Sequence, residues 1–122
     1  MTSDIKRGVS LYSFQHETFQ GKMSLEDCFK TCADMGALGI EIIGEQTFWG
    51  WPEASVDEAK IDEWHALIKK YDATAVSHDF MLDYKRYKGR MMPFEEQVAS
   101  VKKDIDFGAR PVSYTHLTLP TK

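Results

Sequence analysis

Short apolar runs alternate with amphipathic segments along this chain, and the alternation occurs three times. The strand-like runs cover residues 8–14, 39–44 and 73–78, and after each of them apolar residues recur at helical spacing. A strand, a helix and a second strand in succession form a right-handed unit whose strands are parallel. The pattern therefore predicts an α/β fold with a parallel sheet.

Local signals mark the ends of the first two helices. Ser24 and Asp27 approximate a capping box at the start of the first helix, and Gly36 is suited to close it in a left-handed conformation. A second capping signal, at residues 55–58, precedes a segment with an apolar face. Both segments are therefore expected to be amphipathic helices.

The third helix is predicted to begin at Pro93, because proline suits the first helical position, and to end at Gly108. Its apolar residues repeat at i, i+4, i+7 and i+11 and share one face: Phe94, Val98, Val101 and Ile105.

Two architectures contain such units, a doubly wound open sheet and a (β/α)8 barrel. The first turn from strand to helix has neither a G-x-G-x-x-G motif nor a P-loop. The loops after the strands are long and rich in aromatic residues, whereas the returning turns at 36–38 and 72–73 are short. This asymmetry favours the barrel, whose active site lies in the loops after the strands. A complete barrel takes about 250 residues, so 122 residues predict a partial (β/α)8 barrel of three βα units.

Composition limits the setting in which the chain works. Hydrophobic residues make up 43% and charged residues 28%, as in an ordinary globular protein. No apolar run approaches the roughly 20 residues of a transmembrane helix, and no secretory signal is present. The net charge of −4 argues against nucleic-acid and anionic-membrane partners. Two cysteines, Cys28 and Cys32, suit a reducing compartment, so we expect a cytoplasmic protein.

The C-terminal segment departs from the repeating pattern. Pro111 stands where a buried strand is due, which a central strand tolerates poorly. The stretch VSYTHLTLPTK at 112–122 resembles a translated sequencing adapter, although its alternation also allows a weak strand. We therefore expect residues 1–110 to be the N-terminal part of the barrel and residues 111–122 to be a non-native tail.

Two residues are candidates for catalysis. His78 ends the third strand-like run, where barrel enzymes place metal ligands and bases. Its alternative role is a hydrogen bond to a backbone group. Glu41 lies within the second run, and a carboxylate there needs a partner such as an arginine, a metal ion or a substrate hydroxyl. An internal salt bridge is the equally weighted alternative.

Three more residues are candidates for substrate binding. Tyr12 and Trp49 would present aromatic faces at the mouth of a barrel, which suits stacking on a sugar. Glu45, directly after the second run, would contact polar groups of the substrate. The alternatives without a ligand are that the aromatic rings only pack the loops against the fold and that Glu45 is a solvated acid in a loop.

With these positions, residues 6–110 resemble the xylose isomerase-like TIM-barrel superfamily, which contains sugar phosphate isomerases and epimerases and endonuclease IV-type enzymes. The resembling segments are 8–14, 25–28, 35–42 and 77–80. The most specific of them reads Gly-x-x-Gly-Ile-Glu-Ile and contains Glu41.

The resemblance implies a metal-dependent isomerase or epimerase that acts on a small sugar or sugar phosphate by proton abstraction next to a carbonyl. In the family, Mn²⁺, Mg²⁺, Co²⁺ or Zn²⁺ is held mainly by Glu, Asp and His on later strands, which this chain does not contain. His78 matches a strand-end histidine that relatives use for metal or substrate, and Glu41 matches the second-strand glutamate. We expect both to be catalytic in the full-length parent, and the fragment alone to be inactive and to bind no metal.

Two other functions remain open. The first is an endonuclease IV-type zinc phosphodiesterase, which the acidic charge disfavours. The second is a non-enzymatic sugar-binding or assembly module, because a partial sheet leaves an open edge through which the chain can self-associate.

Overall fold

The computed structural model describes residues 5–49, 55–82 and 90–111, and the backbone of 115–118. Its elements, in chain order, are β1 (Gly8–Ser10), η1 (Leu11–Phe14), α1 (Gln15–Phe19), α2 (Leu25–Asp34), β2 (Gly39–Ile43), η2 (Glu45–Trp49), α3 (Glu58–Lys70), β3 (Thr74–Met81), α4 (Phe94–Gly108) and β4 (Thr115–Thr118). None of the helices in these ranges is long and apolar enough to cross a bilayer.

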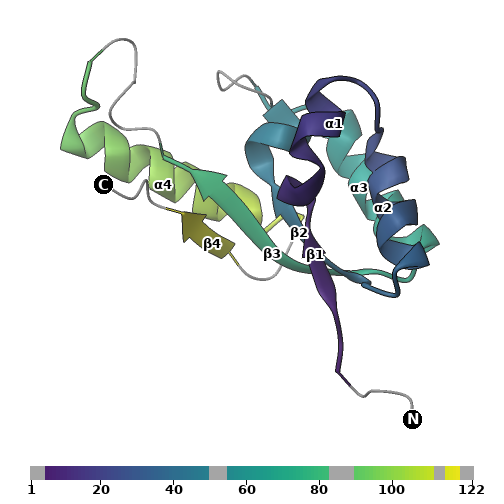
Figure 1. Ribbon diagram of the computed structural model, residues 1–122. Coiled ribbons are helices and arrows are strands. Elements are labelled where there is room, and N and C mark those ends of the chain that lie inside the picture. The colour runs from purple at the N-terminus through teal and green to yellow at the C-terminus, as the bar shows by residue number, and fades with distance from the viewer. Residues whose placement is uncertain (1–4, 50–54, 83–89, 112–114, 119–122) are drawn as a thin grey trace.

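The strands form one sheet in the order β1-β2-β3-β4, and every neighbouring pair is parallel. A helix separates each pair of consecutive strands: α2, α3 and α4 in turn (Figure 1). The predicted α/β class with βα units is therefore confirmed.

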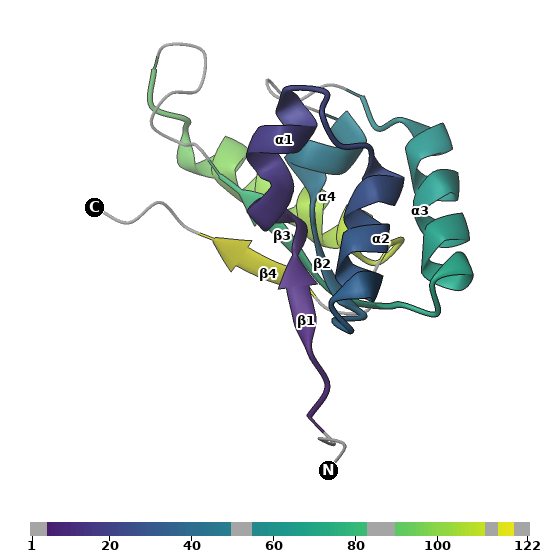
Figure 2. The ribbon, with the colours of Figure 1, turned by 45° about the vertical axis from the view of Figure 1, so that its right-hand side comes forward.

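The three long helices pack on the same face of this sheet (Figure 2). Ile40 and Ile42 of β2 point to that face and belong to one apolar cluster with residues of all three helices: Cys28, Phe29 and Cys32 of α2, Ile61, Trp64 and Leu67 of α3, and Phe107 of α4. A doubly wound sheet carries helices on both faces. Sequential strand order with helices on one face is instead the arrangement found in the wall of a barrel.

β1 is shorter than the predicted strand at 8–14. It ends at Ser10, and the next four residues form the 3-10 helix η1. The Ser10 hydroxyl accepts a hydrogen bond from the backbone N–H of Tyr12. This local side-chain contact offers the backbone an alternative to the sheet ladder, which apolar alternation alone does not reveal.

β3 is longer than predicted, because it runs from Thr74 to Met81 and does not end at His78. His78 and Phe80 are both buried, so the alternation of the strand continues beyond the expected end. The loop after this strand therefore begins later than the run at 73–78 predicts.

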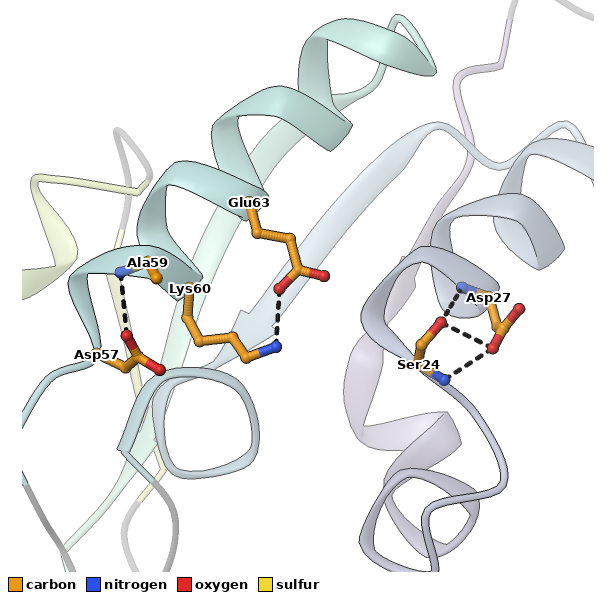
Figure 3. A network of polar contacts seen from close by, with 6 residues as sticks. All are labelled: Ser24, Asp27, Asp57, Ala59, Lys60 and Glu63. Atoms are coloured by element: carbon orange, nitrogen blue, oxygen red, sulfur yellow. Dashed lines mark hydrogen bonds and ion pairs between the residues drawn. The ribbon is translucent and has the colours of Figure 1, made fainter.

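The predicted start of α2 agrees with the structure, and the N-cap of α3 lies within the predicted capping segment at 55–58 (Figure 3). Asp27 accepts a hydrogen bond from the backbone N–H of Ser24 at 2.8 Å, and the Ser24 hydroxyl accepts one from the N–H of Asp27 at 3.1 Å, which completes a capping box. Gly36 follows α2 with φ of +68°, as expected for a left-handed closing residue. At α3, Asp57 accepts a hydrogen bond from the N–H of Ala59.

α4 differs from the prediction in which of its residues are exposed. Pro93 is its N-cap and Phe94 its first residue. The apolar repeat is largely open to solvent, with Phe94 76% and Ile105 50% exposed, while Asp104 and Phe107 are buried. The helix therefore contacts the sheet with a different face from the one that carries the repeat.

The C-terminal segment contributes β4, which pairs with the outer side of β3 at the edge of the sheet. The carbonyl of Pro111 accepts a hydrogen bond from Nε1 of Trp64 at 3.1 Å. The pairing of β4 with β3 does not show whether this segment is native. That residues 111–122 are a non-native tail therefore stays a prediction.

Candidate functional site

The face of the sheet opposite the apolar cluster carries four polar side chains beside the buried Ile43. We call it the polar face and define it by Ser10, Glu41, Ser77 and Asp79. Glu41 of β2 lies opposite Ser10 of β1 and Ser77 of β3, and Asp79 lies opposite Ile43. Because partners in a parallel sheet point to the same side, these side chains gather on one surface.

A hydrogen bond joins the two central residues of the polar face. The Ser77 hydroxyl lies 2.6 Å from Glu41 Oε2, and both side chains are half-buried. An ionised carboxylate only accepts hydrogen bonds, so the hydroxyl is the donor. Among the described residues, Oε1 of Glu41 has no hydrogen-bond partner. That oxygen can accept a proton or a hydroxyl hydrogen from a ligand on the polar face.

A second carboxylate lies at the carboxyl ends of the strands. Glu45, the first residue of η2, is only 8% exposed, and its Oε1 accepts a hydrogen bond from the backbone N–H of Met81 at 3.1 Å. It thus joins the segment after β2 to the last residue of β3. The expected substrate contact of Glu45 stays a prediction, and its observed contact is structural.

His78 and Glu41, each of which the sequence suggested as a catalytic residue, lie on opposite faces of the sheet. His78 is the register partner of Ile42, whereas Glu41 is the partner of Ser77. A β-bulge causes this separation: Ile40 pairs with Ala75 and Glu41 with Ser77, so Val76 is the extra residue. In an unbroken register, His78 would face the same side as Glu41.

The surroundings of His78 are aromatic. Its ring lies 6.2 Å from Trp49, 5.8 Å from Phe80 and 5.5 Å from Phe107, measured between ring centroids. The residue is fully buried, and neither ring nitrogen has a hydrogen-bond partner among the described residues. Burial lowers the pKa of His78 to about 4, because an apolar setting disfavours the charged imidazolium. The imidazole is therefore neutral at pH 7.

The two aromatic candidates have different settings. Trp49 packs edge-on against Phe107 at 4.8 Å and is part of the wall around His78. Tyr12, at 59% exposed, presents its ring to solvent in η1, beyond the end of β1. Packing is thus the observed contact of Trp49, while Tyr12 is open to a ligand. Substrate binding by either residue stays a prediction.

No cluster of three or more His, Cys, Asp or Glu side chains suited to hold a metal ion occurs in the described part of the chain. His78, the predicted metal ligand, is enclosed by the rings of Trp49, Phe80 and Phe107. Metal binding by His78 stays a prediction for the full-length protein.

A hollow of about 470 Å³ lies at the other end of the sheet. It is lined by Thr74, the first residue of β3, by Ala73, Ala75 and Ile68, and by residues 109–111. Ligands of parallel α/β sheets bind at the carboxyl ends of the strands, so this hollow is not the expected binding site.

Ser77 is the residue of the candidate site that sequence reasoning did not single out. It lies between Val76 and His78, and regular alternation counted from Ala75 does not predict that it faces Glu41. A signal existed in the polar alternation of Ser77 and Asp79, which are two residues apart on a strand.

No family model matches the chain. It is 26% identical over 117 residues to the C-glycoside deglycosidase alpha subunit of Arthrobacter globiformis, in an alignment that covers 93% of this chain and 32% of that protein. The chain thus spans about a third of the length of this curated relative.

Proposed function

We propose that this chain is the N-terminal part of a xylose isomerase-like barrel whose full-length protein isomerises or epimerises a small polyhydroxylated substrate, a sugar or sugar phosphate. The observation that carries the proposal is the position of the Glu41 carboxylate. It is hydrogen-bonded to Ser77 on the face of the sheet opposite the three long helices. In a barrel, that face is the interior. The name of the relative, which denotes an enzyme acting on a glycoside, supports a sugar as the substrate class.

The proposed chemistry is a proton transfer at carbon. Oε1 of Glu41 takes the proton from a C–H group next to the substrate carbonyl, and the electron pair of that bond moves to form an enediolate. Return of the proton from Glu41 to the neighbouring carbon, with transfer of the hydroxyl proton between the two enediolate oxygens, gives the isomer. The epimer forms if a second acid, from the part of the barrel outside this chain, donates a proton to the opposite face of the same carbon while Glu41 keeps the proton that it took. No atom is lost and no oxidant is needed.

A divalent metal remains part of the expectation for the full-length protein. Its ligands would come from strands outside this chain, so no step is assigned to the metal here. A cytoplasmic location is likewise proposed, and it is supported by the free, buried thiols of Cys28 and Cys32.

The relative suggests a second function, because its name denotes cleavage of a C-glycoside and not isomerisation. The two functions differ in product. Isomerisation keeps the carbon skeleton of a sugar, whereas deglycosylation separates the sugar from its carbon-linked group.

The deciding experiment incubates the full-length protein with Mn²⁺, Mg²⁺, Co²⁺ or Zn²⁺ and a panel of ketoses, aldoses and their phosphates in D₂O. Proton NMR then follows deuterium uptake at the carbon next to the carbonyl. We expect uptake and a new isomer with at least one sugar. Glu41→Gln, which keeps the shape but removes the base, should slow the exchange at least about 100-fold.

Glu58→Gln is the matched control. Glu58 is an exposed glutamate at the start of α3, away from the polar face, and it forms an ion pair with Arg110. Exchange that is equally fast in Glu41→Gln, or absent with every sugar, would overturn the proposal. In a parallel incubation with a C-glycoside, release of the sugar without deuterium exchange would establish the second function instead.

A further inference from the structure

We infer that Ser77 is a positioning residue for Glu41: its hydroxyl fixes one carboxylate oxygen so that the other faces the substrate. This inference rests on the proposed function, because the role of Ser77 has meaning only if Glu41 accepts a proton. Ser77 itself touches no reacting atom in this scheme.

The contact has the geometry of a charge-assisted hydrogen bond. The Ser77 oxygen lies 2.6 Å from Glu41 Oε2, within the short range of O–H donors to a carboxylate. Glutamate has three side-chain torsions, and without a fixed contact its carboxylate would sample several orientations. One bond to Oε2 restrains that rotation and leaves Oε1 directed elsewhere.

The other neighbour of Glu41 does not share this task. Ser10 faces Glu41 from β1, and its hydroxyl oxygen accepts a hydrogen bond from the backbone N–H of Tyr12 as the cap of η1. Within the described residues, the hydrogen bond to the Glu41 carboxylate comes from Ser77 of β3.

The backbone is shaped so that this contact forms. With Ile40 opposite Ala75, a regular ladder would place Val76 opposite Glu41, and valine has no donor to offer. The bulge at Val76 moves Ser77 into that position instead. Bulges commonly re-aim side chains next to active sites, and here the effect is to give a carboxylate its donor.

The test measures kcat and KM of the full-length protein with the sugar that the exchange experiment identifies as a substrate. Ser77→Ala removes the donor and should lower kcat about 10- to 100-fold, while KM changes less than about threefold, because substrate contacts remain. Ser77→Thr keeps the hydroxyl on a residue suited to strands and should restore kcat to within about threefold of the parent. Ser77→Cys, similar in size but a weak donor, should stay as slow as Ser77→Ala.

Thr74→Ala is the control, because Thr74 is an exposed hydroxyl residue at the far end of the same strand. It should leave kcat unchanged. Full activity of Ser77→Ala, or equal activity of the Thr and Cys variants, would overturn the inference. If Ser77→Ala does not fold, the comparison of Thr with Cys decides. Because Glu41→Gln tests the base itself, a slow Glu41→Gln combined with a fast Ser77→Ala would refute only the positioning role.

Discussion

At the scale of single residues, the lowered pKa of His78 predicts how the stability of the fold depends on pH. Its pKa is about 4 in the folded protein and about 6.5 in an unfolded chain. Between these values the unfolded state takes up a proton that the folded state does not, so stability falls as the pH drops from 6.5 towards 4. At 1.36 kcal/mol per pH unit, the His78 contribution to this loss reaches about 3 kcal/mol near pH 4.

Replacement of the imidazole by an apolar side chain should remove this loss. We expect His78→Leu to be at least as stable as the parent at pH 7, because the wall of Trp49, Phe80 and Phe107 offers no hydrogen bond to lose. Below pH 6.5 its stability should fall less steeply. Urea unfolding at pH 7, 6, 5 and 4.5 measures the difference between the two proteins.

The comparison of His78→Leu with the parent also distinguishes the effect of His78 from that of other buried polar groups on neighbouring elements. Glu45 of η2 and Asp104 of α4 are buried but are unchanged by the substitution, so the difference between the two curves reports the replaced imidazole. His65→Leu makes the same replacement at an exposed position of α3 and is the control for the added apolar side chain. Parallel pH curves for His78→Leu and the parent would contradict the expected pKa of His78.

At the scale of elements, the junction of β2 and η2 depends on a glycine. A methyl group on Gly44 would lie 2.9 Å from Nε2 of His78 and overlap the six-membered ring of Trp49. We expect Gly44→Ala to cost about 2–3 kcal/mol, because Trp49 must leave its place against Phe107. Urea unfolding gives the cost, and near-ultraviolet circular dichroism reports the loss of ring packing.

Gly36→Ala separates this steric effect from backbone strain. Gly36 has φ of +68° and no atom within 4 Å of an added methyl group, so only the left-handed backbone is penalised, by about 1–2 kcal/mol. The near-ultraviolet signal of this variant should match the parent. An unchanged signal in Gly44→Ala as well would show that Trp49 does not need the space beside Gly44.

Sequence alone predicted the elements better than it predicted their relative register. The capping box at Ser24 and Asp27 and the glycine at the end of α2 are short-range signals, and the structure contains both. The bulge at Val76 depends on how two strands meet and has no local signature in the chain. Since a shift of one residue turns every later side chain to the other face, Glu41 and His78 point to opposite faces of the sheet, which alternation along the sequence alone does not reveal.

The orientation of α4 escaped prediction for a related reason. Successive helical residues are about 100° apart, which places the repeat of Phe94, Val98 and Ile105 a little more than a third of a turn from the face of Asp104 and Phe107. Periodicity identifies an apolar stripe but not the neighbour that it packs against. In this helix the stripe forms a flank beside the sheet contact.

At the scale of the whole molecule, the arrangement leaves apolar surface and backbone groups open. The sheet ends at β1 on one side and β4 on the other, and strand edges present unpaired backbone groups that can pair with another chain. The flank of α4 adds an exposed apolar stripe, with Phe94, Val98 and Ile105 all exposed. Both features predict self-association of this chain in solution.

The flank of α4 gives the most direct test of that prediction. We expect Ile105→Lys to weaken self-association about tenfold, because burying a large aliphatic side chain is worth about 1.5–3 kcal/mol when complete and Ile105 is half exposed in the monomer. Sedimentation equilibrium over a range of concentrations measures the dissociation constant. Ala99→Lys adds the same charge at an exposed position of α4 away from the stripe and should leave that constant unchanged. Equal weakening by both variants would assign the effect to charge, and no weakening by Ile105→Lys would leave the strand edges as the contact surface.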